Sequence, residues 1–363
     1  MNKFFWTAIA SGIALVAAIV STILTFGGEQ EPQESLVGVV IPGQVEELGW
    51  NGTHYKGIVS ASQELGAKVL LIEDIKENSG LCRGAVDSLI HAGARMIILG
   101  SYNYADEIAD VIRNHPEIMF YCCAASLRDE NYKVYFARVY QARYLSGILA
   151  GLSTRNNRIG YVAAMNNIEV NRGINAFTLG ARSVNPDARV FVAWTGSWDD
   201  AEREKANVDV LVDSFNVDLV TYHQNQDWVL GEAEARGILS IGYNLESTHY
   251  SEKVLSSVVT NWNMVYREII QDFFQKKKSI SNYWIGLEKD AVGLSFYSPL
   301  VGDSIRQILD ETMLKMKNGM EVFAGPLYDN FGKLRCRKDE LLGDAVLREN
   351  MDWFVKGVEL YEK

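Results

Sequence analysis

The chain has 363 residues, enough for two domains of ordinary size, and 48% of them are hydrophobic. The net charge is −11, with acidic and basic residues interspersed, and this diffuse acidity argues against nucleic-acid binding, which needs a basic face. The one basic run, Lys276-Lys277-Lys278, follows a helical pattern. It is more typical of a helix C-terminus than of a binding patch.

The N-terminus carries a long uncharged segment. From Phe4 to Phe26 no residue is charged, and Lys3 precedes this run. It is longer than the ~7–15 apolar residues of a secretory signal and close to the ~20 that span a bilayer. No clear cleavage site and no lipid-accepting cysteine follow it before Glu29. We therefore expect residues 1–28 to be an uncleaved signal anchor, with a cleaved signal as the alternative, residues 29–35 to be a linker, and the remainder to be exported.

The four cysteines are Cys82, Cys122, Cys123 and Cys336. They lack the C-x-x-C pairing of zinc sites and thioredoxin-like sites. Cys122 and Cys123 follow an apolar run, which predicts buried thiols, but outside the cytoplasm a disulfide to Cys82 remains an alternative. We assign them no function, and we expect neither a metal ion nor a cofactor.

After the linker, short apolar runs alternate with helical patterns. The first series comprises Val37–Ile41 (strand), Trp50–Leu65 (helix), Lys68–Ile72 (strand), Leu81–Ala92 (helix), Met96–Leu99 (strand), a helix ending at Asn114, and Ile118–Tyr121 (strand). Strands separated by about ten to fifteen helical residues predict right-handed βαβ units and a parallel sheet.

The alternation then restarts. The second series comprises Arg158–Val162 (strand), Arg172–Val184 (helix), Val190–Trp194 (strand), Ala201–Ser214 (helix), Leu219–Tyr222 (strand), Leu230–Arg236 (helix) and Leu239–Ile241 (strand). Another apolar segment, Val254–Thr260, leads into a helix through Phe274, whose position suggests that the chain crosses back to the first lobe. A helix over Ser304–Lys317 and the tail complete the chain.

Two such series predict an α/β protein with two doubly wound parallel-sheet lobes and a ligand cleft between them. We expect one lobe to comprise residues 36–141 and about 256–300, and the other to comprise residues 142–255 and about 301–363. Ligands bind beyond the carboxyl ends of parallel strands, so functional residues should lie in the loops that follow the strands.

These loops are rich in aromatic and amide side chains. Trp50 begins the first helix and offers a flat face on which a planar heterocycle can stack, although an ordinary packing role explains it equally well. Amides both donate and accept hydrogen bonds, which suits a ring with mixed edges, but sugars bind similar clefts. The candidate ligand-binding residues are Trp50, Asn51, His54, Tyr102, Asn166, Glu169, Asn175, Trp194, Trp198, His223, Gln224, Asn244 and Trp262.

The motifs of common enzyme classes are missing from the sequence. The first strand is followed by Pro42-Gly43-Gln44 rather than G-x-G-x-x-G, and there is no P-loop, G-x-S-x-G or H-E-x-x-H motif. Of the five scattered histidines, only His54 and His223 are expected near the cleft. Hydrogen bonding by neutral imidazoles explains both, so we expect a protein that is not an enzyme.

Several sequence blocks occur in the order found in one known family. They are Gly49-Trp50-x-x-x-His54-x-x-Gly57, Ile159-Gly160-Tyr161-Val162-Ala163-Ala164, Glu169-Val170-x-Arg172-Gly173-Ile174-Asn175-Ala176-Phe177, Asn185-Pro186-Asp187-Ala188, Trp194-Thr195-Gly196-Ser197-Trp198, Gly325-Pro326-Leu327-Tyr328-Asp329-Asn330 and Met351-Asp352-Trp353-Phe354-Val355. With these blocks the chain resembles, from about Leu36 to Val358, the Bmp (basic membrane protein) family of ABC-transporter substrate-binding proteins, which has purine- and nucleoside-binding members.

The resemblance implies a type I periplasmic-binding-protein fold that closes around a ligand and delivers it to an ABC permease. Similar proteins stack a purine base or nucleoside on the aromatic of the first block, here Trp50, with Asn51 beside it. Many members have an aspartate before this aromatic, where this chain has Glu47-Leu48-Gly49. Nucleoside binders hold the ribose with an acid where this chain has Asn244-Leu245-Glu246. These departures favour a base or a related heterocycle.

Members of the family are commonly lipid-anchored, whereas this chain lacks the acceptor cysteine. The resemblance therefore implies a protein in the periplasm or at the cell surface, with residues 4–26 replacing the lipid as its tether to the cytoplasmic membrane. The alternative function is a membrane-anchored extracytoplasmic sensor, or a binder of another ligand such as a sugar or flavin.

Overall fold

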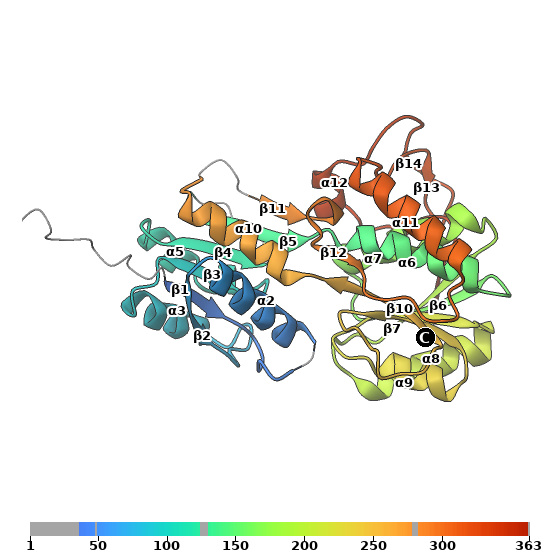
Figure 1. Cartoon of the computed structure of the whole chain (residues 1–363), viewed down its shortest axis with the longest axis horizontal. Coiled ribbons are helices and arrows are strands. Elements are labelled where there is room, and N and C mark those ends of the chain that lie inside the picture. Colours follow the sequence, from blue (N-terminus) through green and yellow to red (C-terminus); the bar gives the residue numbers. More distant parts are fainter. Residues whose placement is uncertain (1–35, 48, 124–129, 278–281, 362–363) are drawn as a thin grey trace, which may run out of the picture.

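The described chain forms two α/β lobes joined by crossing segments (Figure 1). The computed structural model describes residues 36–47, 49–123, 130–277 and 282–361. The predicted anchor, residues 1–28, and the predicted linker, residues 29–35, lie outside these ranges. Among the helices within them, none combines the length and the apolar character needed to cross a membrane.

The first lobe contains a six-stranded parallel sheet with the order β11-β5-β4-β3-β1-β2. Its strands are β1 (Leu36–Val40), β2 (Lys68–Ile72), β3 (Met96–Leu99), β4 (Met119–Cys123), β5 (Tyr132–Ala137) and β11 (Asn282–Ile285). Its helices are α2 (Trp50–Glu64), α3 (Cys82–His91), α4 (Tyr104–Glu107), α5 (Ala109–Asn114) and α10 (Trp262–Phe274).

Alternate side chains of these strands enter different hydrophobic clusters, because successive residues of a strand point to opposite faces of the sheet. In β3, Met96 and Ile98 pack in the cluster that contains residues of α2 and α10, whereas Ile97 and Leu99 pack in the cluster that contains residues of α3 and α5. Helices therefore cover both faces, which is why the strand is apolar throughout.

The second lobe contains a seven-stranded sheet with the order β12-β10-β9-β8-β6-β7-β15, in which only β12 is antiparallel to its neighbour. Its strands are β6 (Arg158–Ala163), β7 (Arg189–Trp194), β8 (Leu219–His223), β9 (Leu239–Tyr243), β10 (Val254–Thr260), β12 (Val292–Leu294) and β15 (Val358–Tyr361). Its helices are α6 (Val139–Ser153), α7 (Ile168–Val184), α8 (Ala201–Phe215), α9 (Trp228–Ala235), η1 (Leu287–Lys289), α11 (Asp303–Lys317) and α12 (Asp344–Glu349).

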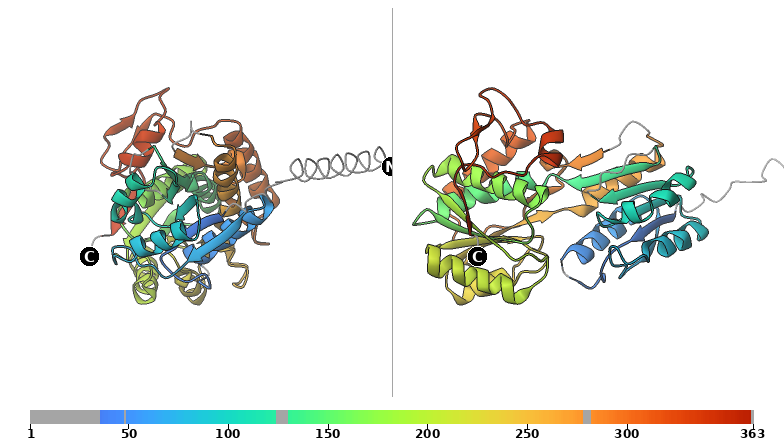
Figure 2. Two further views of the ribbon diagram at one scale, coloured as in Figure 1. Left: turned by 90° about the vertical axis from the view of Figure 1, so that its left-hand side faces the viewer. Right: turned by 180° about the vertical axis from the view of Figure 1, so that it is seen from behind.

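Helices α6 and α7 cover one face of this sheet, and α8 and α9 cover the other (Figure 1). At the contact between α6 and α7, a Cβ atom on Gly147 would lie 2.0 Å from the Phe177 carbonyl oxygen, and one on Gly180 would lie 2.0 Å from that of Tyr144. Only glycine permits this approach. Helices α11 and α12 and the hairpin of β13 (Leu327–Tyr328) and β14 (Leu334–Cys336) form a further layer over α6 and α7 (Figures 1 and 2).

The two-lobed α/β architecture predicted from the sequence is confirmed, but the lobe boundaries differ from those expected. The chain crosses between lobes after β5, after β10 and after β11 (Figure 2). Residues 256–260 belong to β10, which pairs with β9 in the second sheet, so only α10 and β11 return to the first lobe. An apolar strand pattern indicates a buried strand without indicating which of two sheets buries it.

The four cysteines are buried and unpaired, so the disulfide alternative is not adopted. Cys82 and Cys122 pack in the cluster between the first sheet and α3. Burial raises the pKa of the Cys122 thiol to about 12, as expected of an inert core thiol.

A candidate ligand-binding cleft between the lobes

A cleft of about 1100 Å³ lies between the lobes, at the carboxyl ends of their strands. Its first-lobe wall includes Pro42, Trp50, Asn51, Lys76, Glu77, Ser101, Tyr102, Asn103, Phe136 and Trp284. Its second-lobe wall includes Asn167, Ile168, Glu169, Arg172, Trp198, His223, Gln224, Asn225, Tyr243, Asn244, Arg348 and Glu349. Of the residues predicted from the sequence, the structure therefore brings together Trp50, Asn51, Tyr102, Glu169, Trp198, His223, Gln224 and Asn244.

Trp50 is held in place by contacts on several sides. Its indole Nε1 donates a hydrogen bond of 3.0 Å to the carbonyl oxygen of Gly100. Its ring centre lies 4.0 Å from that of His54 and 6.3 Å from that of Phe136, with the Phe136 ring inclined by 30°. The half-buried indole is thereby fixed against the first lobe while it lines the cleft.

The start of α2 also contacts the opposite lobe. The backbone amide of Trp50 donates a hydrogen bond of 3.0 Å to Oδ1 of Asn225, which follows β8. The N-cap residue of α2 is Gly49, which has no side chain to satisfy the first amides of the helix. A Cβ atom on Gly49 would lie 2.4 Å from the carbonyl oxygen of Asn225, so glycine allows the lobes to meet here. Asn225 thus caps α2 from across the cleft.

His54 and Trp262, both predicted as ligand contacts, lie behind Trp50 instead of lining the cleft. His54 is fully buried, its Nδ1 hydrogen bonds with the Tyr266 hydroxyl, and burial lowers its pKa well below the ordinary value. The Trp262 ring lies 3.7 Å from that of His54. One face of helix α2 carries Trp50 to the cleft and His54 into the core, because residues four apart lie on the same side of a helix. His54 and Trp262 therefore support Trp50.

Asn51 lines the cleft, but its side-chain amide is already engaged. Its Oδ1 accepts a hydrogen bond of 3.2 Å from the Gly43 amide, and its Nδ2 donates one of 2.5 Å to Glu47. These contacts fix the loop after β1. The structural role of Asn51 is therefore to shape the first-lobe wall.

The second-lobe wall contains a polar group formed by Glu169, whose side chain is 29% exposed, and the buried His223 and Gln224. His223 Nε2 lies 3.8 Å from Glu169 Oε1, and the His223 ring lies 4.4 Å from that of Tyr243. Burial raises the pKa of Glu169, and burial followed by the repulsion of nearby guanidinium groups lowers the pKa of His223. Both shifts favour the neutral forms. With Nδ1 of His223 unpaired within the described residues, this pair offers hydrogen-bonding groups to a ligand.

Gln224 offers a further hydrogen-bond acceptor. The residue is almost fully buried, its Nε2 donates to Thr195 Oγ1 at 2.9 Å, and its Oε1 has no partner within the described chain. A buried amide oxygen without a hydrogen bond is destabilising, and a ligand N–H would satisfy it.

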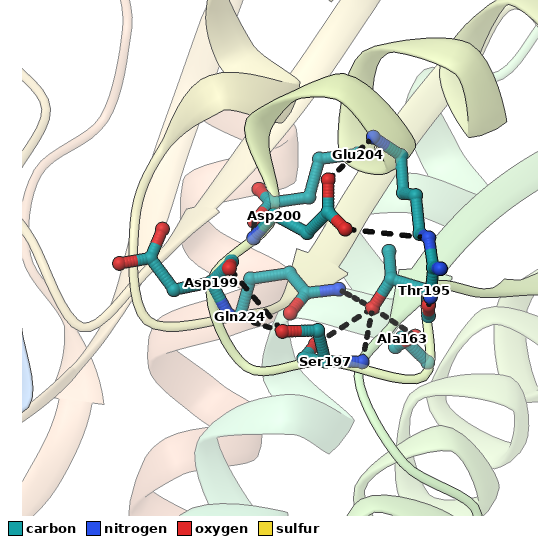
Figure 3. A network of polar contacts seen from close by, with 8 residues as sticks. Ala163, Thr195, Ser197, Asp199, Asp200, Glu204 and Gln224 are labelled. Carbon is teal, nitrogen blue, oxygen red and sulfur yellow. Dashed lines mark hydrogen bonds and ion pairs between the residues drawn. The ribbon is translucent and has the colours of Figure 1, made fainter.

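A hydrogen-bond network holds the loop that carries Trp198 (Figure 3). Thr195 Oγ1 accepts from Gln224 and from the Ser197 amide, and it donates to the Ser197 carbonyl oxygen. Asp200 caps α8 through the Arg203 amide, and its own amide donates to Glu204. Trp198, which is 40% exposed, is thus presented to the cleft from a loop with a defined conformation.

The predicted contacts Asn166, Asn175 and Trp194 do not line the described cleft. Asn166 accepts a hydrogen bond of 2.9 Å from Asn171, and the Trp194 ring packs 6.2 Å from that of Phe354. Asn175 is buried in α7, where its amide holds the backbone of Trp353 and Val355. Their proximity to strand ends suggested binding, but Asn175 and Trp194 contact the C-terminal segment, and Asn166 contacts Asn171.

Several cleft residues were not among those predicted. Phe136 and Trp284 lie on β5 and β11, strands whose positions beside the cleft the sequence pattern did not reveal. Tyr243 directly precedes the predicted Asn244, and Arg172 lies in a block that carried the family resemblance. Arg348 comes from the C-terminal segment, where no strand end marked it.

Comparison with known proteins supports this architecture. The sequence model of the Bmp family, described as "ABC transporter substrate-binding protein PnrA-like", matches residues 34–324. A purine-binding protein of Brucella abortus (strain 2308) is 28% identical over 348 residues, which cover 94% of this chain and 98% of the relative. A putative ABC transporter glucose-binding protein of Haloferax volcanii is 26% identical over 343 residues, which cover 92% of this chain and 82% of the relative.

A crystal structure of an ABC transporter solute-binding protein from Aeropyrum pernix K1 shows the same fold, with a TM-score of 0.65 and 19% identity over 78% of this chain and 92% of that one. The resemblance seen in the sequence is thus confirmed. This chain belongs to the Bmp family of PnrA-like ABC-transporter substrate-binding proteins, a family of extracytoplasmic solute-binding proteins, and has the type I periplasmic-binding-protein fold.

Proposed function

We propose that this protein captures a purine base or nucleoside in the cleft between its lobes and delivers it unchanged to an ABC permease. The observation that carries the proposal is the presence of aromatic rings on both walls. Trp50 and Phe136 line the first-lobe wall, and Trp198 and Tyr243 line the second. A flat ring that enters between them is stacked as the lobes close, because planar heterocycles gain stacking energy on aromatic faces.

The polar groups of the second-lobe wall complement such a ring. A purine presents both hydrogen-bond donors and acceptors at its edge. Gln224 provides an acceptor, Asn244 an amide, and His223 an imidazole with one donor and one acceptor nitrogen. The purine-binding relative from Brucella supports this ligand class, and the putative glucose-binding relative makes a sugar the comparison that the experiment must include.

The same groups support a binding role without catalysis. Glu169 and His223 resemble an acid–base pair by their separation of 3.8 Å. However, no third side chain orients the imidazole, because His223 Nδ1 has no hydrogen-bond partner within the described residues, and a general base is normally held by such a partner. We therefore assign the pair to ligand recognition.

Delivery to a permease requires the protein to work outside the cytoplasm. We propose that residues 4–26, which lie outside the described ranges, tether it to the cytoplasmic membrane as an uncleaved anchor. Intact-mass measurement of the protein recovered from membranes tests the tether. A mature chain that begins near Gly27 would show cleavage and remove it.

The ligand is tested in two steps. Native mass spectrometry of the purified protein identifies a ligand carried through purification. Calorimetric titration then compares adenine, guanine, hypoxanthine and their nucleosides with glucose and riboflavin. We expect saturable binding of at least one purine, with weaker or no binding of glucose and riboflavin. Binding of glucose or riboflavin without any purine would overturn the proposal.

A further inference from the structure

Three guanidinium groups surround one indole ring at an edge of the cleft. The guanidinium carbons of Arg138, Arg172 and Arg348 lie 4.4, 5.0 and 5.9 Å from the ring centre of Trp284. The indole is fixed by a hydrogen bond of 3.1 Å from its Nε1 to the carbonyl oxygen of Ala137. Stacking on an indole is favourable for arginine, so this ring holds side chains from separate parts of the chain in one place.

The three arginines differ in how their charge is balanced. Arg138 donates to both carboxylate oxygens of Asp344, at 2.8 and 2.6 Å. Arg172 donates to the carbonyl oxygen of Leu347 at 2.7 Å, and Arg348 makes a long contact of 3.4 Å with Asn282. Within the described ranges, neither Arg172 nor Arg348 has a carboxylate within 4.0 Å. Two of the three cations therefore lack a paired anion.

Both unpaired arginines line the cleft. Arg172 is only 6% exposed, and a buried charge without a counter-ion is costly. Burial is the largest cause of the lowered pKa of Arg172; attraction by Glu169 opposes this lowering, and repulsion by Arg348 adds to it. An anion placed between the two guanidinium groups would relieve both effects.

The nearby acids do not fill this role. Glu169 lies one turn before Arg172 in α7, but its carboxylate oxygens do not come within 4.0 Å of the Arg172 guanidinium nitrogens. Glu349 is exposed to solvent, which screens its charge. Arg143 is fully buried, with its guanidinium carbon 4.0 Å from the Tyr243 ring centre, and adds positive potential behind this wall.

We propose that Arg172 and Arg348 form an anion subsite, and that the ligand carries an oxyanion, a phosphate or a carboxylate, joined to its planar ring. The guanidinium fork suits such a group because it donates two parallel N–H bonds to the oxygens of a carboxylate or phosphate. This inference rests on the proposed function, in which the aromatic walls hold a purine ring. It makes an acidic purine derivative, rather than an uncharged base, the preferred ligand.

The test compares three ligands by calorimetry on the full-length chain. Adenine carries the ring alone, adenosine 5′-monophosphate adds a phosphate, and 9-(carboxymethyl)adenine adds a carboxylate. We expect at least one acidic ligand to bind about tenfold or more tightly than adenine, and the better of the two distinguishes a phosphate subsite from a carboxylate subsite.

Arg348→Gln is the informative variant because, among the described residues, Arg348 makes a single long hydrogen bond, so its loss should leave the fold intact. We expect this variant to lower the affinity for the acidic ligand by about tenfold to a hundredfold, and the affinity for adenine by less than about threefold. Arg189→Gln is the matched control. It removes the same charge from the same lobe, but Arg189 pairs with Glu359 at 2.8 Å and does not line the described cleft, so the affinities of this variant should stay unchanged. Arg172→Gln repeats the test should R348Q lower the melting temperature.

The outcomes separate the two proposals. Adenine binding without any preference for the acidic ligands, or an equal effect of R348Q on all three, overturns the subsite and leaves the proposed function in place. If no purine binds, the proposed function fails, and inorganic phosphate alone then decides the subsite. Phosphate should raise the melting temperature of the wild type above that in chloride of equal ionic strength. An equal rise in R348Q would refute the subsite.

Discussion

Replacing Trp50 with alanine tests whether the first-lobe wall binds its ligand by stacking. The indole is fixed by Gly100, His54 and Phe136 on the protein side, and it lines the cleft. Stacking of a base on an aromatic side chain contributes about 1–3 kcal/mol. We therefore expect Trp50→Ala to weaken binding of the purine about 5- to 150-fold, and Trp50→Phe, which keeps a flat ring, to weaken it far less.

Calorimetric titration at a temperature where each variant is folded measures this effect. Trp228→Ala is the control, because Trp228 is another partly exposed tryptophan at the start of a helix, 42% exposed, but it does not line the described cleft. It should leave the affinity unchanged. If Trp50→Ala binds as tightly as the wild type, Trp50 has only a packing role and the stacking argument is wrong.

Three further changes test other parts of the site. Asn225→Ala removes the acceptor that caps α2 from the opposite lobe, which should weaken ligand binding about fivefold and shift small-angle scattering toward a more open shape, whereas Asn225→Asp keeps the acceptor. Gln224→Leu removes the unpaired acceptor and should lower the affinity for adenine about tenfold, as measured by calorimetry. A purine that lacks the matching N–H should lose little affinity. Burial raises the pKa of Glu204 to about 8. The Glu204 carboxyl therefore stays protonated in the folded state up to about pH 8, whereas in the unfolded state it loses its proton near pH 4.5. Stability should therefore fall by about 1.4 kcal/mol per unit as pH rises between these values, and chemical denaturation of Glu204→Gln should show a shallower slope.

The sequence predicted the strands well where their neighbours in the chain were regular helices. It did not reveal α6, although this helix has 15 residues. Every residue from Val139 to Gly151 is buried, so the segment lacks the polar face that makes a helical period visible. Because α6 was missed, the boundary between the lobes was expected near residue 141, whereas the whole helix packs on α7.

The candidate site was predictable only in part, for a similar reason. Loops after strands identified Trp198, His223 and Gln224, because strand ends of a parallel sheet meet at one edge. The same rule selected Asn175, whose amide is buried and holds the C-terminal segment. Whether an amide faces a ligand or a neighbouring backbone depends on tertiary packing, which the order of residues along one strand and loop does not specify.

The C-terminal segment shows how the two walls of the cleft depend on one another. The family model ends at residue 324, yet the segment beyond it is attached to α7 by Asn171, Arg172 and Asn175. Through Arg172 it is held at Leu347, and the next residue is Arg348, which approaches the Trp284 ring of the first lobe. The C-terminal segment thus contributes a charged group to a cleft that earlier parts of the chain build. In this chain, the aromatic walls favour a planar ring, and the charge that distinguishes one planar ligand from another comes partly from its last 39 residues.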